Sequence, residues 1–292
     1  MILRDKPGIP ALLFAVRGSV LPHIAPQLLF VGLFSAAVVA VDRNLLTLPH
    51  VQAAPLAVFG VALSLFLGFR NNAAYDRWWE ARRLWGGLLA DARSIAREAE
   101  LFLIDPQDRR QLLVAMRAFL HQHRCALRGL TPDAAARREA PDEPTPDATL
   151  DAMARQLAEA FRAGRMDGFG ARTLSARLSG IALAQAGCER IRLTPLPYVY
   201  SLLIFRTTWL YCLLLPFALL EPTGWLTPLF AVIVAYTFFG LAEVTEELAH
   251  PFGLTANALP LDAICRTAEI SLAPHLGEET PPPLLPVGYR LD

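Results

Sequence analysis

The chain has little charge and almost no lysine. Of its 292 residues 18% are charged, whereas an ordinary soluble domain has about 25%. Lys6 is the single lysine among 27 basic residues, and the formal net charge at pH 7 is zero. This balance offers no basic field for a polyanion, so we expect no nucleic-acid partner. The hydrophobic share of 54% excludes a disordered chain.

The sequence also lacks the spaced residues of most catalytic and metal centres. No HExxH, GxSxG or phosphate-binding loop is present. His121 and His123 are two residues apart, which places them on different sides of a helix, and we interpret them as surface residues. We therefore predict a protein that is not an enzyme and holds no cofactor. The four cysteines have no metal or redox spacing and are interpreted as separate thiols: Cys125, Cys188, Cys212 and Cys265.

Long uncharged runs are what the chain has in abundance. A helix needs about 20 apolar residues to cross the hydrocarbon core of a bilayer. Four runs predict such helices, at about 21–41, 50–69, 195–220 and 223–242. The third is the least regular, because Arg206 and Pro216 interrupt it. A soluble protein with buried helices is the alternative, and the length of the runs argues against it.

Arginine placement predicts the orientation of these helices. Twenty arginines lie in 70–192, whereas the two short connectors between spans contain Arg43 alone. Basic residues collect in cytoplasmic segments, so we expect both termini and the middle segment in the cytoplasm. The predicted organisation is an N-terminal cytosolic segment (1–20), two spans (21–69), a cytosolic helical region (70–192), two further spans (193–242), a cytosolic C-terminal helical segment (243–275) and a tail (276–292).

The middle segment is predicted to be helical. Apolar residues recur there at steps of three and four, which is typical of amphipathic helices. The pattern predicts helices at about 84–102, 112–120, 150–161 and 174–191. The first stops before Asp105-Pro106, and the third has Pro146 near its start. No strand pattern is present, so the expected fold class is an all-α integral membrane protein.

Three acidic residues at the end of the fourth run form a weak candidate metal site. Glu243, Glu246 and Glu247 share one helical face, and His250 follows them. Carboxylates could bind a hard cation. The alternative is that they are the charged cytosolic end of a span.

An apolar stripe on the second predicted span is a candidate gate. Val61, Leu65 and Phe69 fall four residues apart, beside small residues that allow close helix approach. In a single subunit such a stripe would face lipid or the core. If several subunits surround an axis, it forms stacked apolar rings that can gate ions by dewetting. The pattern does not choose between these cases.

A charged and tryptophan-rich segment follows at once. Arg70, Asp76, Arg77 and Glu80 are polar enough to lie at the membrane surface. Trp78 and Trp79 suit either an interfacial belt or a packed subunit contact.

These residues carry a resemblance to a known family. The segment GFRNNAAYDRWWEARRLWG (68–86) resembles the hallmark segment of bestrophins, in their bacterial branch. PLPYVYS (195–201), with Pro197, resembles the opening of the family's third span, and HPFG (250–253) the segment after the fourth. The likeness covers roughly 20–275. It implies a homopentameric ion channel with one axial pore and four spans per subunit, in a bacterial inner membrane, whose partners are its own copies, the bilayer and permeant monovalent ions.

The resemblance also assigns roles to residues. It places a hydrophobic pore neck on Val61, Leu65 and Phe69, anchored by Gly68 and by the Arg-Trp-Trp that follows. It implies a second constriction, a cytosolic aperture, for which Ile181 is the best match and Leu178 the second, although Ile181 could equally be a core residue. Pro251, Phe252 and Gly253 are matched as motif residues. For the permeant ion, the bacterial branch favours monovalent cations, with chloride as the open alternative.

One departure from the family concerns calcium. Animal bestrophins bear an acidic run after the PFG segment that binds calcium, whereas residues 253–262 here contain only Asp262. Calcium needs several oxygen ligands, so we do not expect a calcium clasp. Two other classes stay open: a secondary transporter, and a membrane scaffold or receptor that does not conduct.

Overall fold

The computed structural model describes residues 1–3, 8–9, 15–16, 18–49, 51–138 and 145–292. Within these residues the chain is helical and forms no strand beyond two isolated bridges near its ends, which confirms the all-α prediction. The chain divides into two compact units. We call 5–78 with 195–250 the apolar unit, and 1–4 with 79–194 and 251–292 the polar unit. Helix α3 (Ala53–Phe102) contributes its first part to the apolar unit and the rest to the polar unit.

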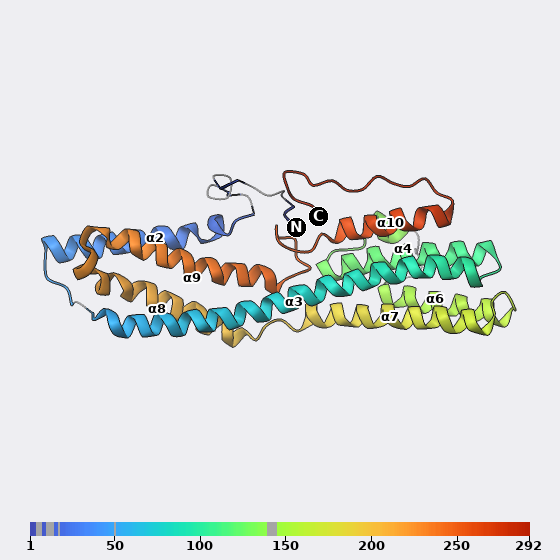
Figure 1. Cartoon of the computed structure of the whole chain (residues 1–292), viewed down its shortest axis with the longest axis horizontal. Helices are drawn as coiled ribbons and strands as arrows, with labels where there is room; N and C mark the ends of the chain where they lie inside the picture. The colour runs from blue at the N-terminus through green and yellow to red at the C-terminus, as the bar shows by residue number, and fades with distance from the viewer. Residues whose placement is uncertain (4–7, 10–14, 17, 50, 139–144) are drawn as a thin grey trace. The chain divides into compact units, whose positions relative to one another are not determined.

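The apolar unit is a bundle of four helices. It contains α2 (Leu21–Asn44), the first part of α3, α8 (Tyr198–Thr223) and α9 (Thr227–Ala249). The short 3-10 turn η1 (Gly224–Leu226) joins α8 to α9, which folds back along it (Figure 1). One continuous apolar cluster receives side chains from all four helices, among them Val31, Leu63, Cys212 and Ala235.

Three helical stretches are long and apolar enough to cross a membrane: Leu21–Asn44, Ala53–Phe102 and Tyr198–Ala249. The last comprises α8, η1 and α9. The sequence predicts a span at 50–69 and a helix at 84–102 as separate elements, and the structure joins them in one uninterrupted helix. The reason is local: residues 70–83 contain neither proline nor glycine and include four arginines and three alanines, which favour helix.

The polar unit also consists of helices. They are the later part of α3, α4 (Pro106–Arg128), α5 (Ala134–Arg138), α6 (Pro146–Arg162), α7 (Gly168–Leu193) and α10 (Leu261–Leu276). The side chains of Asp105, Thr145 and Asp167 cap α4, α6 and α7 by accepting hydrogen bonds from backbone N–H groups of the first turn. The helices predicted in the middle segment are therefore confirmed. Parts of the N-terminal segment 1–20 and of the loop after α5 lie outside the described residues.

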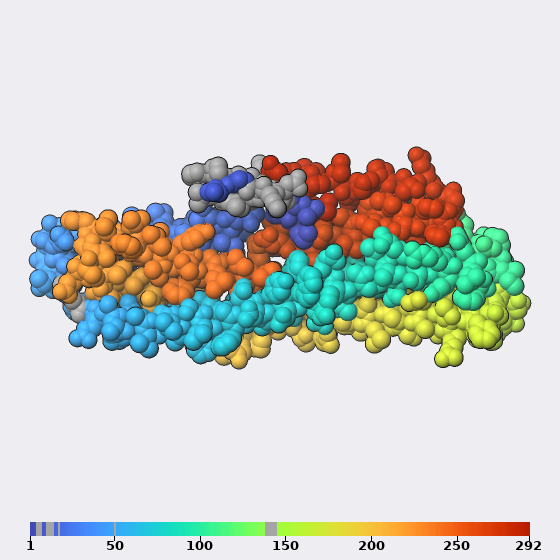
Figure 2. All heavy atoms as spheres, viewed as in Figure 1, coloured from blue at the N-terminus to red at the C-terminus, as the bar shows by residue number. Residues whose placement is uncertain are grey.

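The tail after α10 is extended. It runs back along that helix, because the Ala263 N–H in the first turn of α10 donates to the Asp292 carbonyl at 2.8 Å. The N-terminal residues join it: the Leu3 N–H donates to the Tyr289 carbonyl at 2.8 Å. Figure 2 shows the atoms of this tail gathered over α10. The two ends of the chain are thus hydrogen-bonded to each other, and the tail is hydrogen-bonded to α10, within the polar unit.

The prediction that His121 and His123 lie at the surface is wrong. Both are buried, because α4 packs against α6 on one side and α10 on another. His123 is 0% exposed and is stacked between the rings of Trp85 and Phe119, with centroid separations of 5.5 Å and 5.6 Å. Neither of its ring nitrogens has a hydrogen-bond partner among the described residues. Burial lowers the pKa of His123 to about 4.

Replacing His123 with Phe should flatten the acid dependence of stability. A histidine whose folded pKa is depressed stabilises the fold fully above its ordinary pKa of 6.5 and loses that contribution as pH falls towards 4. The full loss is on the order of 3 kcal/mol. His123→Phe keeps the ring stack and has no proton to bind. The measurement is the melting temperature of purified protein across this pH window.

The control for this prediction is His250→Gln, which removes an exposed histidine. It should keep the acid dependence of the wild type. Parallel melting curves of wild type and His123→Phe at every pH would contradict the assignment of a buried neutral ring.

Candidate functional site

The stripe of Val61, Leu65 and Phe69 lies on a face of α3 that is left exposed by the described residues of the chain. These side chains are 62%, 56% and 68% exposed. Leu63 and Leu67, at most 2% exposed, are on nearly the opposite side of the helix and pack into the core of the apolar unit. The packed face therefore turns the stripe away from the subunit's own bundle.

Small residues beside the stripe behave differently from one another. Gly60 faces α8, where an added Cβ would approach the Tyr211 hydroxyl to 2.7 Å, so this position permits close packing of the two helices. No described residue lies within 4 Å of a Cβ added at Gly68. Close approach is thus required at the start of the stripe and not at its end.

Arg70 fixes α3 immediately after the stripe. Its side chain is buried, with the residue 8% exposed, and its Nη2 group donates to Glu246 Oε2 on α9 and to Ser201 Oγ on α8, both at 2.8 Å. One guanidinium therefore ties three helices together. Charge-assisted hydrogen bonds of this kind are stronger than neutral ones, and here they hold the rotation of α3 one residue beyond Phe69.

The segment after Arg70 contributes further anchors. Arg77 Nε donates to the carbonyl of Ala249, the last residue of α9, at 2.8 Å. Asp76 and Trp79 are exposed and Trp78 is half-buried. Glu80 pairs with Arg190 on α7 at 2.5 Å. The charged motif residues thus hold helix ends, whereas the ring of Trp79 is left at the surface of the chain.

The motif residues near α8 and α9 shape the chain where helices begin and end. Pro197 precedes the first residue of α8. Pro251 and Phe252 are buried after α9, and the Pro251 carbonyl accepts the Leu259 N–H at 2.8 Å. This hydrogen bond closes a tight loop that contains Gly253 and leads into α10.

The two candidates for the cytosolic aperture differ in burial. Ile181 is 0% exposed within the helices of its own polar unit, and Leu178 is half-buried. Both are on α7, fewer than four residues apart. In this arrangement Leu178 is the one that reaches the surface of the chain.

Comparison with known proteins decides the family. The model of the family described as Bacterial/Fungal Bestrophin protein matches residues 1–274. The chain belongs to the bestrophin family. It is 45% identical to a voltage-dependent anion channel-forming protein of Mesorhizobium japonicum, over 98% of this chain and 95% of that one. It is 38% identical to the Escherichia coli protein YneE, also described as voltage-dependent anion channel-forming, over 98% of each chain. A crystal structure of a bacterial bestrophin homologue from Klebsiella pneumoniae matches with a TM-score of 0.82 and 34% identity, covering 88% of this chain and 99% of that one.

The acidic cluster of this bestrophin is divided among different partners. Glu246 binds Arg70, and Glu243 lies 3.5 Å from His23 Nδ1. Glu247 is buried. The described part of the chain contains no group of three His, Cys, Asp or Glu side chains that could hold a metal ion. Glu243 and Glu246 therefore serve as ion-pair partners at the end of α9.

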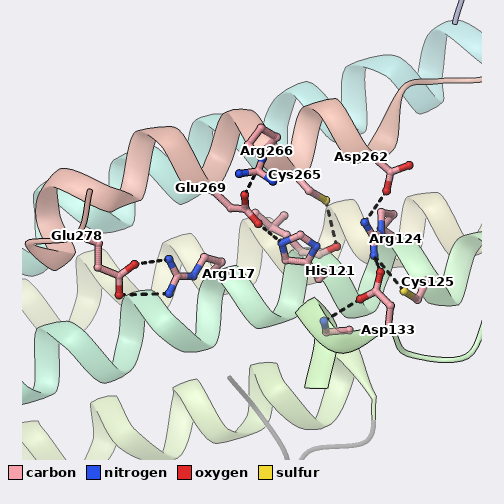
Figure 3. A network of polar contacts seen from close by, with 12 residues as sticks. Arg117, His121, Arg124, Cys125, Asp133, Asp262, Cys265, Arg266, Glu269 and Glu278 are labelled. Atoms are coloured by element: carbon pink, nitrogen blue, oxygen red, sulfur yellow. Dashed lines mark hydrogen bonds and ion pairs between the residues drawn. The ribbon is translucent and has the colours of Figure 1, made fainter. Parts of the chain in front are cut away.

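A polar network that sequence reasoning did not predict joins α4 to α10 and to the residues just after it (Figure 3). His121 Nε2 lies 2.7 Å from Glu269, Arg117 donates to Glu278 at 2.7 Å, and Asp262 accepts from Arg124 at 2.5 Å and from Arg128. Although burial opposes ionisation, the hydrogen bond with His121 and the nearby positive charge of Arg266 lower the pKa of Glu269. The network was missed because its members are more than 130 residues apart in the bestrophin sequence.

Removing the Glu246 carboxylate should destabilise the bestrophin fold. Glu246→Gln leaves the buried Arg70 guanidinium with a weaker partner, which should cost about 1–2 kcal/mol because Glu246 itself is half-exposed. The measurement is thermal unfolding in detergent. Arg70→Met combined with Glu246→Gln should recover part of the loss, since no buried charge is then left.

The matched control is Glu221→Gln, at an exposed glutamate near the other end of α8. It should unfold like the wild type. Equal melting temperatures for Glu246→Gln and Glu221→Gln would show that the pair with Arg70 contributes nothing.

Proposed function

We propose that this bestrophin is an ion channel that assembles as a homopentamer around an axial pore. In each subunit α2, the first part of α3, α8 and α9 cross the membrane, with both termini and the polar unit in the cytoplasm of a bacterial cell, below its inner membrane. The family match over 1–274, the channel-forming names of the relatives and the apolar helices support this proposal.

The observation that carries the proposal is the unpartnered stripe on α3. Three apolar side chains one turn apart are exposed opposite the face that packs into the core. Five copies of Val61, Leu65 and Phe69 around an axis would form three stacked rings. Rings of this kind conduct only when wetted, and they strip water from ions without binding them.

The neck cannot choose the sign of the ion, because its three residues are uncharged. The bacterial resemblance favours monovalent cations, whereas the relatives are described as anion channel-forming proteins. Under the proposal, charges at the mouths of the pore determine whether cations or anions pass. A reversal potential measured in asymmetric salt on reconstituted protein reads the sign directly.

For the cytosolic aperture, Ile181 and Leu178 remain the two candidates. Burial of Ile181 inside its own subunit favours Leu178 as the residue that faces a partner or the pore. Calcium has no part in the proposal. Asp262, the single carboxylate of 253–262, is bound to Arg124 and Arg128, so the loop offers no free acidic ligand.

Shortening the neck residues should raise conduction. Leu65→Ala or Phe69→Ala widens a ring and eases its wetting. A barrier lowered by about 1 kcal/mol raises flux about fivefold. The measurement is single-channel conductance in bilayers with purified protein. Leu33→Ala is the control, because Leu33 on α2 is similarly exposed, at 64%, and should not change conductance.

Two results would contradict the channel. Wild-type liposomes without ion flux would favour a scaffold or receptor, and saturable flux coupled to a second solute would favour a transporter. Unchanged conductance in Leu65→Ala and Phe69→Ala would remove these residues from the gate while leaving the channel in place.

The aperture candidates separate by what each substitution changes. Leu178→Ala should alter conductance with little loss of stability. Ile181→Ala should create a cavity that costs about 2–5 kcal/mol of unfolding free energy, with conductance preserved in the folded protein. The measurements are bilayer recording and thermal unfolding of the same preparations. Altered conductance in Ile181→Ala at unchanged stability would instead place Ile181 at the pore.

A further inference from the structure

A cavity of about 420 Å³ lies between α2, α3, α8 and α9 within the apolar unit. One side is apolar and includes Ile204, Phe205 and Phe239. The other side is polar and includes Arg70, Glu243 and Glu246. A volume in this range accommodates a small ligand or the polar end of a larger one.

The charged groups of the cavity have a definite balance. Among the residues that the structure describes, Arg70 is the one arginine of its lining, whereas Glu243 and Glu246 provide two carboxylates. The Nη2 group of Arg70 donates to Glu246 and Ser201, whereas its buried Nε has no hydrogen-bond partner among the residues that the structure describes. His23 lies beside Glu243 at the edge of this group. The lining of the cavity therefore combines one guanidinium, whose buried Nε–H has no partner among the described residues, with two acidic groups.

A second buried polar group without a partner among the described residues lines the same cavity, the hydroxyl of Thr208. Thr208 is 1% exposed, and its hydroxyl has no hydrogen-bond partner in the described part of the chain. Its neighbour Thr207, by contrast, donates to the Leu203 carbonyl at 2.8 Å within its own helix. An unmade hydrogen bond at a buried site costs roughly 1–3 kcal/mol, so the Thr208 hydroxyl points to a polar atom that enters the cavity.

The position of the charges along the helices indicates the kind of ligand. Arg70 is the first charged residue after the uncharged run 44–69, and Glu243 is the first after 222–242. Charges that end membrane-length runs lie at the level of lipid headgroups. The apolar wall extends from there along α8 towards the centre of the run.

We propose that this cavity binds the headgroup of a zwitterionic aminophospholipid. The phosphate accepts the Arg70 Nε–H, the ammonium donates to Glu243 and Glu246, and an ester oxygen accepts the Thr208 hydroxyl. The first chain carbons lie against Phe205 and Phe239. An anionic lipid without an amine would meet two carboxylates with only one cation, and a choline headgroup has no N–H to donate.

Lipid retention tests the proposal without reference to ion flux. The full-length protein is reconstituted in vesicles of equal phosphatidylethanolamine, phosphatidylcholine and phosphatidylglycerol, extracted in mild detergent and analysed by native mass spectrometry. The wild type should retain phosphatidylethanolamine above the other two. Thr208→Val should reduce this retention about fivefold, the equivalent of one lost hydrogen bond.

Matched controls separate the site from general effects. Thr207→Val and Glu221→Gln should retain lipid like the wild type, whereas Glu243→Gln should lower retention. Thr208→Val is isosteric and removes a buried hydroxyl that has no partner among the described residues, so its melting temperature should not fall below that of the wild type. Glu243→Gln changes a different group of the cavity, a carboxylate next to His23, and therefore serves as an independent second variant.

Three outcomes overturn the proposal. Retention of the three lipids in equal amounts excludes a headgroup site, and preference for phosphatidylglycerol assigns the cavity to simple anion binding by Arg70. Equal retention by Thr208→Val and Thr207→Val leaves the cavity to water or to a neighbouring subunit. In each case flux through the neck is unaffected, so failure here is distinct from failure of the channel proposal.

Discussion

The packing of one face of α3 is the constraint on which the rest depends. Leu56, Leu63 and Leu67 are buried in the core of the apolar unit, and a helix that buries one face must present the opposite one elsewhere. That opposite face carries Val61, Leu65 and Phe69. In a soluble protein such an exposed stripe would demand a partner. In a subunit of a symmetric ring, the partner is the same stripe on the other copies.

Arg70 shows how a membrane protein uses a costly residue. A guanidinium at the end of an apolar run is expensive to bury, and here it is held by Glu246 and Ser201 on two other helices. A change in the rotation of α3 would break both contacts. The same arginine that holds the direction of the stripe also lines the polar end of the neighbouring cavity, so under both proposals the cavity's ligand and the neck share one group.

The parts of the fold that were predictable are those set by local pattern. The helices could be located from long uncharged runs and from apolar residues that recur every three or four positions, because a buried helix face leaves this period in neighbouring residues. The continuity of α3 was missed since the change from apolar to charged composition at Arg70 resembles an end, although no residue there breaks a helix. His121 and His123 were misplaced for a different reason. Whether a histidine is at the surface depends on which helices pack against it, and α10 is more than 130 residues away.

The candidate site likewise contains features that a local sequence pattern predicts and features that it does not. The stripe is visible in the sequence because its members are one turn apart, whereas the contacts of Arg70 and the network around Asp262 join residues distant in the sequence and leave no local pattern. The proposed neck, being uncharged, has a further consequence for the channel. Apolar rings act on the hydration of an ion and hardly on its sign. Relatives that keep such a neck could therefore prefer different ions because of charges elsewhere. The cation selectivity expected from the bacterial resemblance and the description of the relatives as anion channel-forming proteins are thus compatible with the same apolar gate.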